Sequence, residues 1–311
     1  MSDLAGQRVL VTGASGFIGA RLCRAAVGRG ALVYAVSRRA MAPAASAQLR
    51  WERADLTDAA AVRAVVARVR PDVVLHLASE VAGTRERDAV LPMLHANLLA
   101  AVNVMVAADE AGCGRVVLAG SVEEPDLGDP DALAQSPYAA AKWGAQAYGR
   151  MFHALYALPV VHLRLFMVYG PGQRDVRKLV PYVTCSLLRG EAPLLSSGER
   201  AVDWIYVDDV VDAFLAAATA PGVEGSSLDV GTGTLVSVRA LAARLADLVG
   251  GDAEPVFGAI PDRPRERVRV ADTQAAAAAI GWLPRVALDE GLARTVAFYR
   301  ETVAREAPAR A

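Results

Sequence analysis

Residues 9–19, with the sequence VLVTGASGFIG, constrain the fold most, because an apolar run breaks into three glycines and then continues at helical spacing. Gly13 and Gly16 have no Cβ, so the backbone there can approach an anion closely. The helix that follows offers free N–H groups and the positive end of its dipole at the same point. Gly19 allows this helix to pack closely on the strand. The stretch therefore predicts a phosphate-binding turn.

The first half of the chain alternates strands with helices. Such alternation requires parallel strands joined by right-handed crossovers, which is a doubly wound α/β sheet of the Rossmann type. A cofactor is expected across the carboxyl ends of these strands. The predicted strands cover residues 8–11, 32–36, 49–52, 71–78, 115–119 and 160–168, and the predicted helices cover residues 20–26, 58–69, 90–111 and 138–158.

Composition excludes several classes of protein. With 311 residues, 54% of them hydrophobic, and a net charge of −1, the chain can bury a large core. No basic face indicates nucleic acid, and no uninterrupted apolar stretch approaches the roughly 20 residues that cross a bilayer. The N-terminus does not resemble a signal peptide, so we expect a cytoplasmic protein. Cys23, Cys113 and Cys185 are far apart, which favours buried thiols over disulfides or metal ligands, and no metal site is expected.

Tyr138 and Lys142 are the strongest candidates for catalysis. They are four residues apart on a predicted helix, so the phenol and the ammonium share one face, where the cation can lower the pKa of Tyr138. The chain has 33 basic residues, and only Lys142 and Lys178 among them are lysines. A lysine retained where arginine is otherwise preferred indicates a site that needs a compact ammonium. We expect Tyr138 to act as a general acid.

The glycine turn, Ser121 after the fifth predicted strand and the Tyr138/Lys142 pair follow one another in the order of a known family. The chain resembles the extended short-chain dehydrogenases/reductases, the NAD-dependent epimerase/dehydratase family, from about residue 6 to 300, and is most like a nucleotide-sugar 4-ketoreductase. The later segments that carry the resemblance are RLFMVYGPG (residues 164–172), DWIYVDDV (203–210), ADT (271–273) and GWLP (281–284).

The resemblance implies roles for the catalytic residues and a domain organisation. Ser121 would orient the substrate carbonyl, Tyr138 would give the proton, and Lys142 would hold the cofactor ribose; a turn-forming serine is the alternative for Ser121. It also implies a dinucleotide-binding domain at residues 1–165 and a smaller, mainly substrate-binding lobe at residues 166–311, with a segment at about 201–232 returning to the Rossmann core. The family makes a homodimer the expected assembly.

The cofactor is expected to be NADP. No Asp or Glu lies between Asp3 and Glu52, so the carboxylate that holds the ribose of NAD is missing, whereas Arg38 and Arg39 could bind a 2′-phosphate. The alternative is that these arginines are solvated loop charges, and Asp55 could equally cap a turn. The expected cofactor-binding residues are Gly13, Ser15, Gly16, Phe17, Ile18, Gly19, Ser37, Arg38, Arg39, Asp55, Leu56, Leu77, Ala78, Ser79, Tyr138 and Lys142.

The substrate is expected to be a small molecule, most of all a nucleotide sugar. Met167 and Val202 stand where sugar-nucleotide enzymes of this family usually carry Asn and Arg, so a diphosphate would need other cations. Proline-broken loops at residues 171–178, 193–200 and 255–269 would form the lobe. The proposed substrate-binding residues are Glu123, Arg174, Lys178 and Arg265, although an acidic turn is an equal interpretation of Glu123, Glu124 and Asp126.

These features predict an NADPH-dependent reductase of a keto group, most of all the 4-keto group of a nucleotide-linked 4-keto-6-deoxysugar. A redox-neutral nucleotide-sugar 4-epimerase or 4,6-dehydratase with tightly bound NAD(P) is the first alternative, and Glu123 favours the dehydratase. A non-catalytic NADP-binding sensor is the second, although a sensor would not need Ser121, Tyr138 and Lys142 together.

Overall fold

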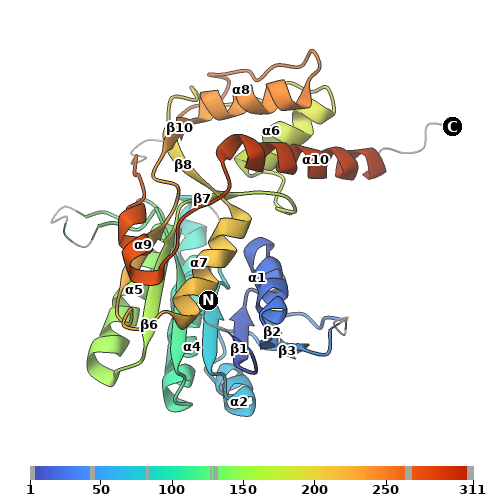
Figure 1. Cartoon of the computed structure of the whole chain (residues 1–311). Helices are drawn as coiled ribbons and strands as arrows, with labels where there is room; N and C mark the ends of the chain where they lie inside the picture. Colours follow the sequence, from blue (N-terminus) through green and yellow to red (C-terminus); the bar gives the residue numbers. More distant parts are fainter. Residues whose placement is uncertain are drawn as a thin grey trace. The chain divides into compact units, whose positions relative to one another are not determined.

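The structure is a computed structural model that describes residues 4–42, 46–81, 84–126, 128, 132–262 and 268–306. The chain divides into two compact units (Figure 1). The first contains Met1–Leu165, Val210–Val230 and Gln274–Trp282, and the second contains Phe166–Asp209, Gly231–Thr273 and Leu283–Ala311. The segment that returns to the first unit is therefore shorter than the expected 201–232, and a second returning segment, at 274–282, was not predicted.

The first unit is built on a parallel sheet of seven strands among the described residues, which confirms the predicted doubly wound α/β fold. The order of its strands reverses between β1 and β4, and such switch points are where ligands bind in open α/β sheets. Across the sheet the strands are β3 (Leu49–Arg53), β2 (Leu32–Ser37), β1 (Arg8–Thr12), β4 (Val73–His76), β5 (Arg115–Ser121), β6 (Val160–Leu165) and β9 (Ser227–Val230).

Helices cover this sheet, and several begin at the caps that their sequences provide. Asp58 accepts hydrogen bonds from the amides of Ala60 and Ala61, and Ser136 accepts one from the amide of Ala139. The helical segments of this unit are α1 (Phe17–Gly28), α2 (Ala59–Val69), η1 (Arg87–Ala89), α3 (Val90–Met93), η2 (Leu94–Leu99), α4 (Ala100–Glu110), α5 (Pro137–Tyr156), most of α7 (Val207–Thr219) and most of α9 (Thr273–Ile280).

The helical run Arg87–Glu110 is continuous. By its length and composition alone it could cross a membrane. Its most apolar window has a mean hydropathy of 1.7, and 39% of that window is buried inside the protein. The α4 part contributes Val104 and Met105, both fully buried, to the core of the first unit. The α4 part of the run is therefore a core helix of the α/β unit by its packing. Its middle portion, η2, is a π-helix, a form that is frequent at functional sites.

The sixth predicted strand, residues 160–168, is in fact two strands. β6 ends at Leu165 in the parallel sheet, and β7 (Met167–Tyr169) pairs with β8 (Ala201–Tyr206) in the other unit. Buried Phe166 lies at the break. The prediction was wrong because both strands are apolar and adjacent, so the sequence shows one uninterrupted run.

The second unit contains a three-stranded sheet among the described residues, with β8 between β7 and β10 (Leu235–Ser237). Asp203 on β8 is 1% exposed and accepts hydrogen bonds from the amides of Thr232 (2.7 Å), Gly233 (2.9 Å) and Ala271 (3.1 Å), so one carboxylate ties three chain segments together. The helices of this unit are α6 (Leu179–Leu188), α8 (Val238–Val249) and α10 (Leu288–Glu306).

The three cysteines are buried and free, as predicted. Burial raises the pKa of the Cys23 thiol to about 12 and that of Cys113 to about 11. Neither thiol is therefore a nucleophile at neutral pH.

Candidate active site

The glycine turn lies where β1 meets the end of β4. The Thr12 hydroxyl is 2.9 Å from Nδ1 of His76 and accepts hydrogen bonds from the amides of Leu77 and Ala78, so it joins the two strand ends. Gly13 has a φ of 67°, and a Cβ there would lie 2.7 Å from the Ala78 amide nitrogen. His76 is 2% exposed, and burial lowers its pKa to about 3.

Helix α1 begins in a way that suits a phosphate. Its N-cap is Gly16, and no side chain among the described residues caps it, in contrast to α2 and α5. The amides of its first turn are therefore available to an anion. A Cβ on Gly19 would overlap the Gly13 carbonyl, so the helix packs on the turn through this glycine as expected. Turn, helix start and strand ends together fit the pyrophosphate of a dinucleotide.

Ser121 and Tyr138 meet at the carboxyl end of β5. The Ser121 hydroxyl accepts a hydrogen bond from the Glu123 amide (3.2 Å). Tyr138, 8% exposed on the first turn of α5, is buried, and burial raises the pKa of its phenol. Hydrogen bonds with Ser121 and Ser79 act in the opposite direction. Two serines, one at the end of β5 and one in the loop after β4, therefore contact the phenol oxygen.

Lys142 lies one turn further along α5 and is 4% exposed. Its ammonium donates a hydrogen bond to the Ala119 carbonyl (2.8 Å) and is 6.0 Å from the centre of the Tyr138 ring. Burial lowers the pKa of Lys142 to about 8. The expectation that Lys142 lowers the pKa of Tyr138 is corrected here: burial dominates, and it keeps the phenol protonated, which is the form that a general acid needs.

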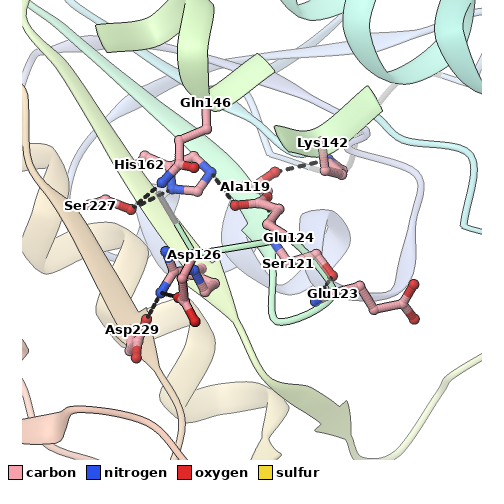
Figure 2. A network of polar contacts seen from close by, with 11 residues as sticks. Ala119, Ser121, Glu123, Glu124, Asp126, Lys142, Gln146, His162, Ser227 and Asp229 are labelled. Atoms are coloured by element: carbon pink, nitrogen blue, oxygen red, sulfur yellow. Dashed lines mark hydrogen bonds and ion pairs between the residues drawn. The ribbon is translucent and has the colours of Figure 1, made fainter. Parts of the chain in front are cut away.

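The acidic turn after β5 is not uniformly solvated. Glu123 is exposed, with a carboxylate oxygen 3.4 Å from the Ser136 hydroxyl. Glu124 is 1% exposed and accepts a hydrogen bond from the Ser121 amide (2.7 Å). Figure 2 shows the two side chains pointing in different directions, with Glu124 directed toward His162. The solvated interpretation was therefore wrong for Glu124.

Asn97, in the π-helix η2, was missed by the sequence analysis. Its side-chain carbonyl accepts hydrogen bonds from the Ser79 hydroxyl (2.7 Å) and the Glu80 amide (2.9 Å), and its amide donates to the Glu80 carbonyl (3.1 Å). Asn97 thereby holds the loop after β4 that brings Ser79 to Tyr138. The available signal was an amide side chain inside an apolar helical run.

The structure gives the expected adenosine end a definite geometry. Arg38 and Arg39 are exposed and follow β2 directly, and the Ser37 hydroxyl accepts a hydrogen bond from the Arg39 amide (3.2 Å). Asp55 accepts hydrogen bonds from the Thr57 amide (2.9 Å) and hydroxyl, which lower the pKa of Asp55, with a further lowering from Arg38. Asp55 therefore caps the turn before α2, the alternative that the sequence left open.

The proposed substrate-binding residues belong to different units. Glu123 belongs to the first unit, while exposed Arg174 and half-buried Lys178, the N-cap residue of α6, belong to the second. Arg265 lies outside the described residues. Met167 and Val202, the two departures from the family pattern, lie on β7 and β8.

Comparisons with known proteins agree with this geometry. The family model for the NAD dependent epimerase/dehydratase family matches residues 9–231. The chain is 34% identical to a UDP-glucose 4-epimerase of Mycolicibacterium smegmatis, with 94% of this chain and 98% of that protein covered. It is 30% identical to a dTDP-glucose 4,6-dehydratase of Streptomyces niveus, with 94% and 93% covered.

Among solved structures, MoeE5 in complex with UDP-glucuronic acid and NAD is 34% identical, with a TM-score of 0.83 and with 95% of this chain and 99% of that chain covered. The glycine turn, the order of Ser121, Tyr138 and Lys142, the family match and the full-length similarity lead to one conclusion. The chain belongs to the NAD dependent epimerase/dehydratase family.

Proposed function

We propose that this protein acts on a nucleotide sugar as a redox-neutral 4-epimerase or 4,6-dehydratase. The observation that carries the proposal is the meeting of Ser121, Tyr138 and Lys142 at the carboxyl end of β5, beside the glycine turn. The relatives named above are epimerases and dehydratases of nucleotide sugars, and they support this alternative better than the net 4-ketoreduction that the sequence favoured.

The residues of this chain have separable roles in such a reaction. A bound nicotinamide dinucleotide supplies the redox chemistry. Tyr138 accepts the proton of the sugar hydroxyl as that hydroxyl is oxidised to a keto group, and the phenol then holds this proton for the later reduction step. Burial, which raises the pKa of Tyr138, favours the protonated form. Ser121 orients the same oxygen through its hydroxyl. Lys142 donates one of its three hydrogen bonds to Ala119 and keeps two for the ribose and the phenol.

Net ketoreduction with NADPH is the second candidate, and one observation favours it. Arg38 and Arg39 are exposed directly after β2, where a carboxylate would be needed to select NAD. NADPH is the reductant of choice for an enzyme that exchanges its cofactor at each turnover, so the preference for NADP and the reductase activity belong to one proposal.

The remaining parts of the proposal concern partners. Arg174 and Lys178 are the proposed cations for the substrate diphosphate, and Glu123 is a proposed sugar ligand. A homodimer would cover Leu91, which is 64% exposed, and neighbouring apolar side chains on α3, η2 and α5. We also propose that the protein works in the cytoplasm.

Turnover assays with and without net cofactor change distinguish the two candidates. The purified protein is incubated with UDP-glucose, dTDP-glucose and UDP-glucuronic acid, and separately with 4-keto sugar nucleotides plus NADPH or NADH, while products and cofactor absorbance are followed. Product formed from the hexoses with constant cofactor absorbance supports the redox-neutral enzyme. If NADPH is consumed stoichiometrically with the 4-keto sugar nucleotides and the other three sugar nucleotides are not converted, the protein is a reductase and the redox-neutral proposal is wrong.

A further inference from the structure

Glu124 is a buried carboxylate built into the backbone of the catalytic loop. Its side chain is 0% exposed, Oε1 accepts the Ser121 amide at 2.7 Å, and its own amide donates to the Ser121 carbonyl at 3.0 Å. The two residues thus bond to each other twice, and the carboxylate lies behind the catalytic serine. A carboxylate in an apolar core is costly unless it is paired, so its presence needs an explanation.

The partner of this carboxylate comes from the neighbouring strand β6. Nε2 of His162 lies 3.3 Å from Glu124 Oε2, and Nδ1 lies 2.8 Å from the Ser227 hydroxyl on β9. Gln146, one helical turn after Lys142, donates a hydrogen bond to the same hydroxyl (2.9 Å). Figure 2 shows this chain of contacts passing from Glu124 through His162 to Ser227 and Gln146. The contacts therefore join the catalytic loop to the catalytic helix.

Gly120 makes room for the pair. A Cβ at Gly120 would overlap the His162 imidazole and lie 2.8 Å from Glu124 Oε1. The glycine before the catalytic serine, the buried glutamate and the histidine therefore belong to one arrangement.

We propose that Glu124 is a positioning residue that fixes the backbone of Ser121 and serves as the buried counter-charge of Lys142. The roles of Glu124 and Lys142 in turnover rest on the proposed function. The effect of Glu124 on the titration of Lys142 can be measured without it.

Lys142 and Glu124 bond to backbone groups two residues apart at the end of β5: the ammonium donates to the Ala119 carbonyl and the carboxylate accepts from the Ser121 amide. Burial lowers the pKa of Lys142, and Glu124 acts against this lowering. In turn, Lys142 and His162 both favour the ionised form of Glu124, whose pKa is lowered despite its burial. His76 on β4, kept neutral by burial, and the protonated phenol of Tyr138 are the other titratable groups that face the pair. Glu124 is the anion in this set.

The composition of the chain permits a direct test. Lys142 and Lys178 are its only lysines, so a Lys178→Arg background leaves Lys142 as the sole lysine signal in NMR spectra of protein labelled with ¹³C-lysine. The pH titration of that signal is recorded with Glu124 intact, in Glu124→Gln, which retains the size and an acceptor for the Ser121 amide, and in Glu123→Gln as the matched exposed control. We expect Glu124→Gln to move the midpoint to lower pH by about one unit, and Glu123→Gln to leave it in place.

A midpoint that Glu124→Gln leaves unchanged, or that Glu123→Gln moves equally, would overturn the counter-charge. Turnover on the substrate found for the wild type supplies the second readout: Glu124→Gln should lose activity mainly on the alkaline side, whereas Glu124→Val, which also removes the acceptor of the Ser121 amide, should lower kcat at every pH. Equal kcat in Val and Gln variants at acidic pH would overturn the positioning of Ser121. A shifted midpoint in a protein that converts no nucleotide sugar would refute the proposed function and leave the counter-charge established.

Discussion

The Ser79 hydroxyl donates a 2.7 Å hydrogen bond to the side-chain carbonyl of Asn97, and the same serine also reaches the phenol of Tyr138. Asn97 lies in a π-helical segment and is 1% exposed. The irregular turn of this helix therefore carries a side chain that sets the position of a residue next to the proposed acid.

Asn97→Leu should destabilise the protein and impair turnover. The substitution leaves Ser79 and both backbone groups of Glu80 without their buried partner, and we expect a loss of about 1–3 kcal/mol in the free energy of unfolding. Asn103→Leu, which removes one hydrogen bond to the Leu56 carbonyl (2.9 Å), serves as the control for simple destabilisation. Denaturant unfolding and kcat are measured for both. If both variants lose kcat to the same extent, Asn97 has no special relation to the site.

The glycine turn and the Tyr138/Lys142 pair were predictable because local spacing determines them. A strand, three glycines and a helix define the turn, and four residues of helix define the pair. Glu124 was not predictable in this way, since its burial depends on His162, 38 positions away in sequence and on another strand. The break at Phe166 was hidden for a related reason: strand pairing, not apolar pattern, assigns β6 and β7 to different sheets.

Tyr138→Phe should reduce turnover by roughly 10²–10⁴-fold, the range typical of a lost general acid, and leave cofactor affinity nearly unchanged. The phenol is the group that holds the proton, while the ring packing is retained by phenylalanine. Tyr148→Phe, an exposed position on the same helix, is the matched control. Turnover within a few-fold of the wild type would transfer the acid role to another residue, with Glu123 the next to test.

Turnover should fall as the pH rises through about 8, the pKa to which burial lowers Lys142. Below this pH the ammonium is charged and can hold the ribose; above it the charge is lost, so the loss lies on the alkaline side. Lys142→Arg keeps its charge throughout this range, and its residual turnover should lack this alkaline loss. If wild-type turnover is constant from neutral pH to well above 8, turnover does not depend on the charge of Lys142.

Removing both arginines after β2 should change cofactor choice. In Arg38→Ala/Arg39→Ala we expect NADPH affinity to fall by roughly 10²–10⁴-fold, because charged hydrogen bonds contribute about 1.5–3 kcal/mol each and two are removed, with NADH affinity little altered. Arg50→Ala, an exposed arginine on β3, is the control. Fluorescence titration with each cofactor measures the four constants. If the wild-type protein binds NADH as tightly as NADPH, Arg38 and Arg39 do not select the 2′-phosphate and are ordinary surface charges.

The exposed apolar side chains of two packed helices lead to the last prediction. Leu91 and Leu94 are 64% and 41% exposed on α3 and η2, and Tyr148 is 43% exposed on α5, which packs on this run where Gly144 meets Leu98. Large exposed apolar side chains on packed helices indicate an interaction site, and burial contributes roughly 25 cal/mol per Å². A second copy of the chain, with the same two helices, would cover it symmetrically. Leu91→Glu/Leu94→Glu should therefore convert a dimer into monomers in sedimentation experiments, whereas Leu248→Glu on α8 should not. A wild-type protein that sediments as a monomer at micromolar concentration would refute the homodimer.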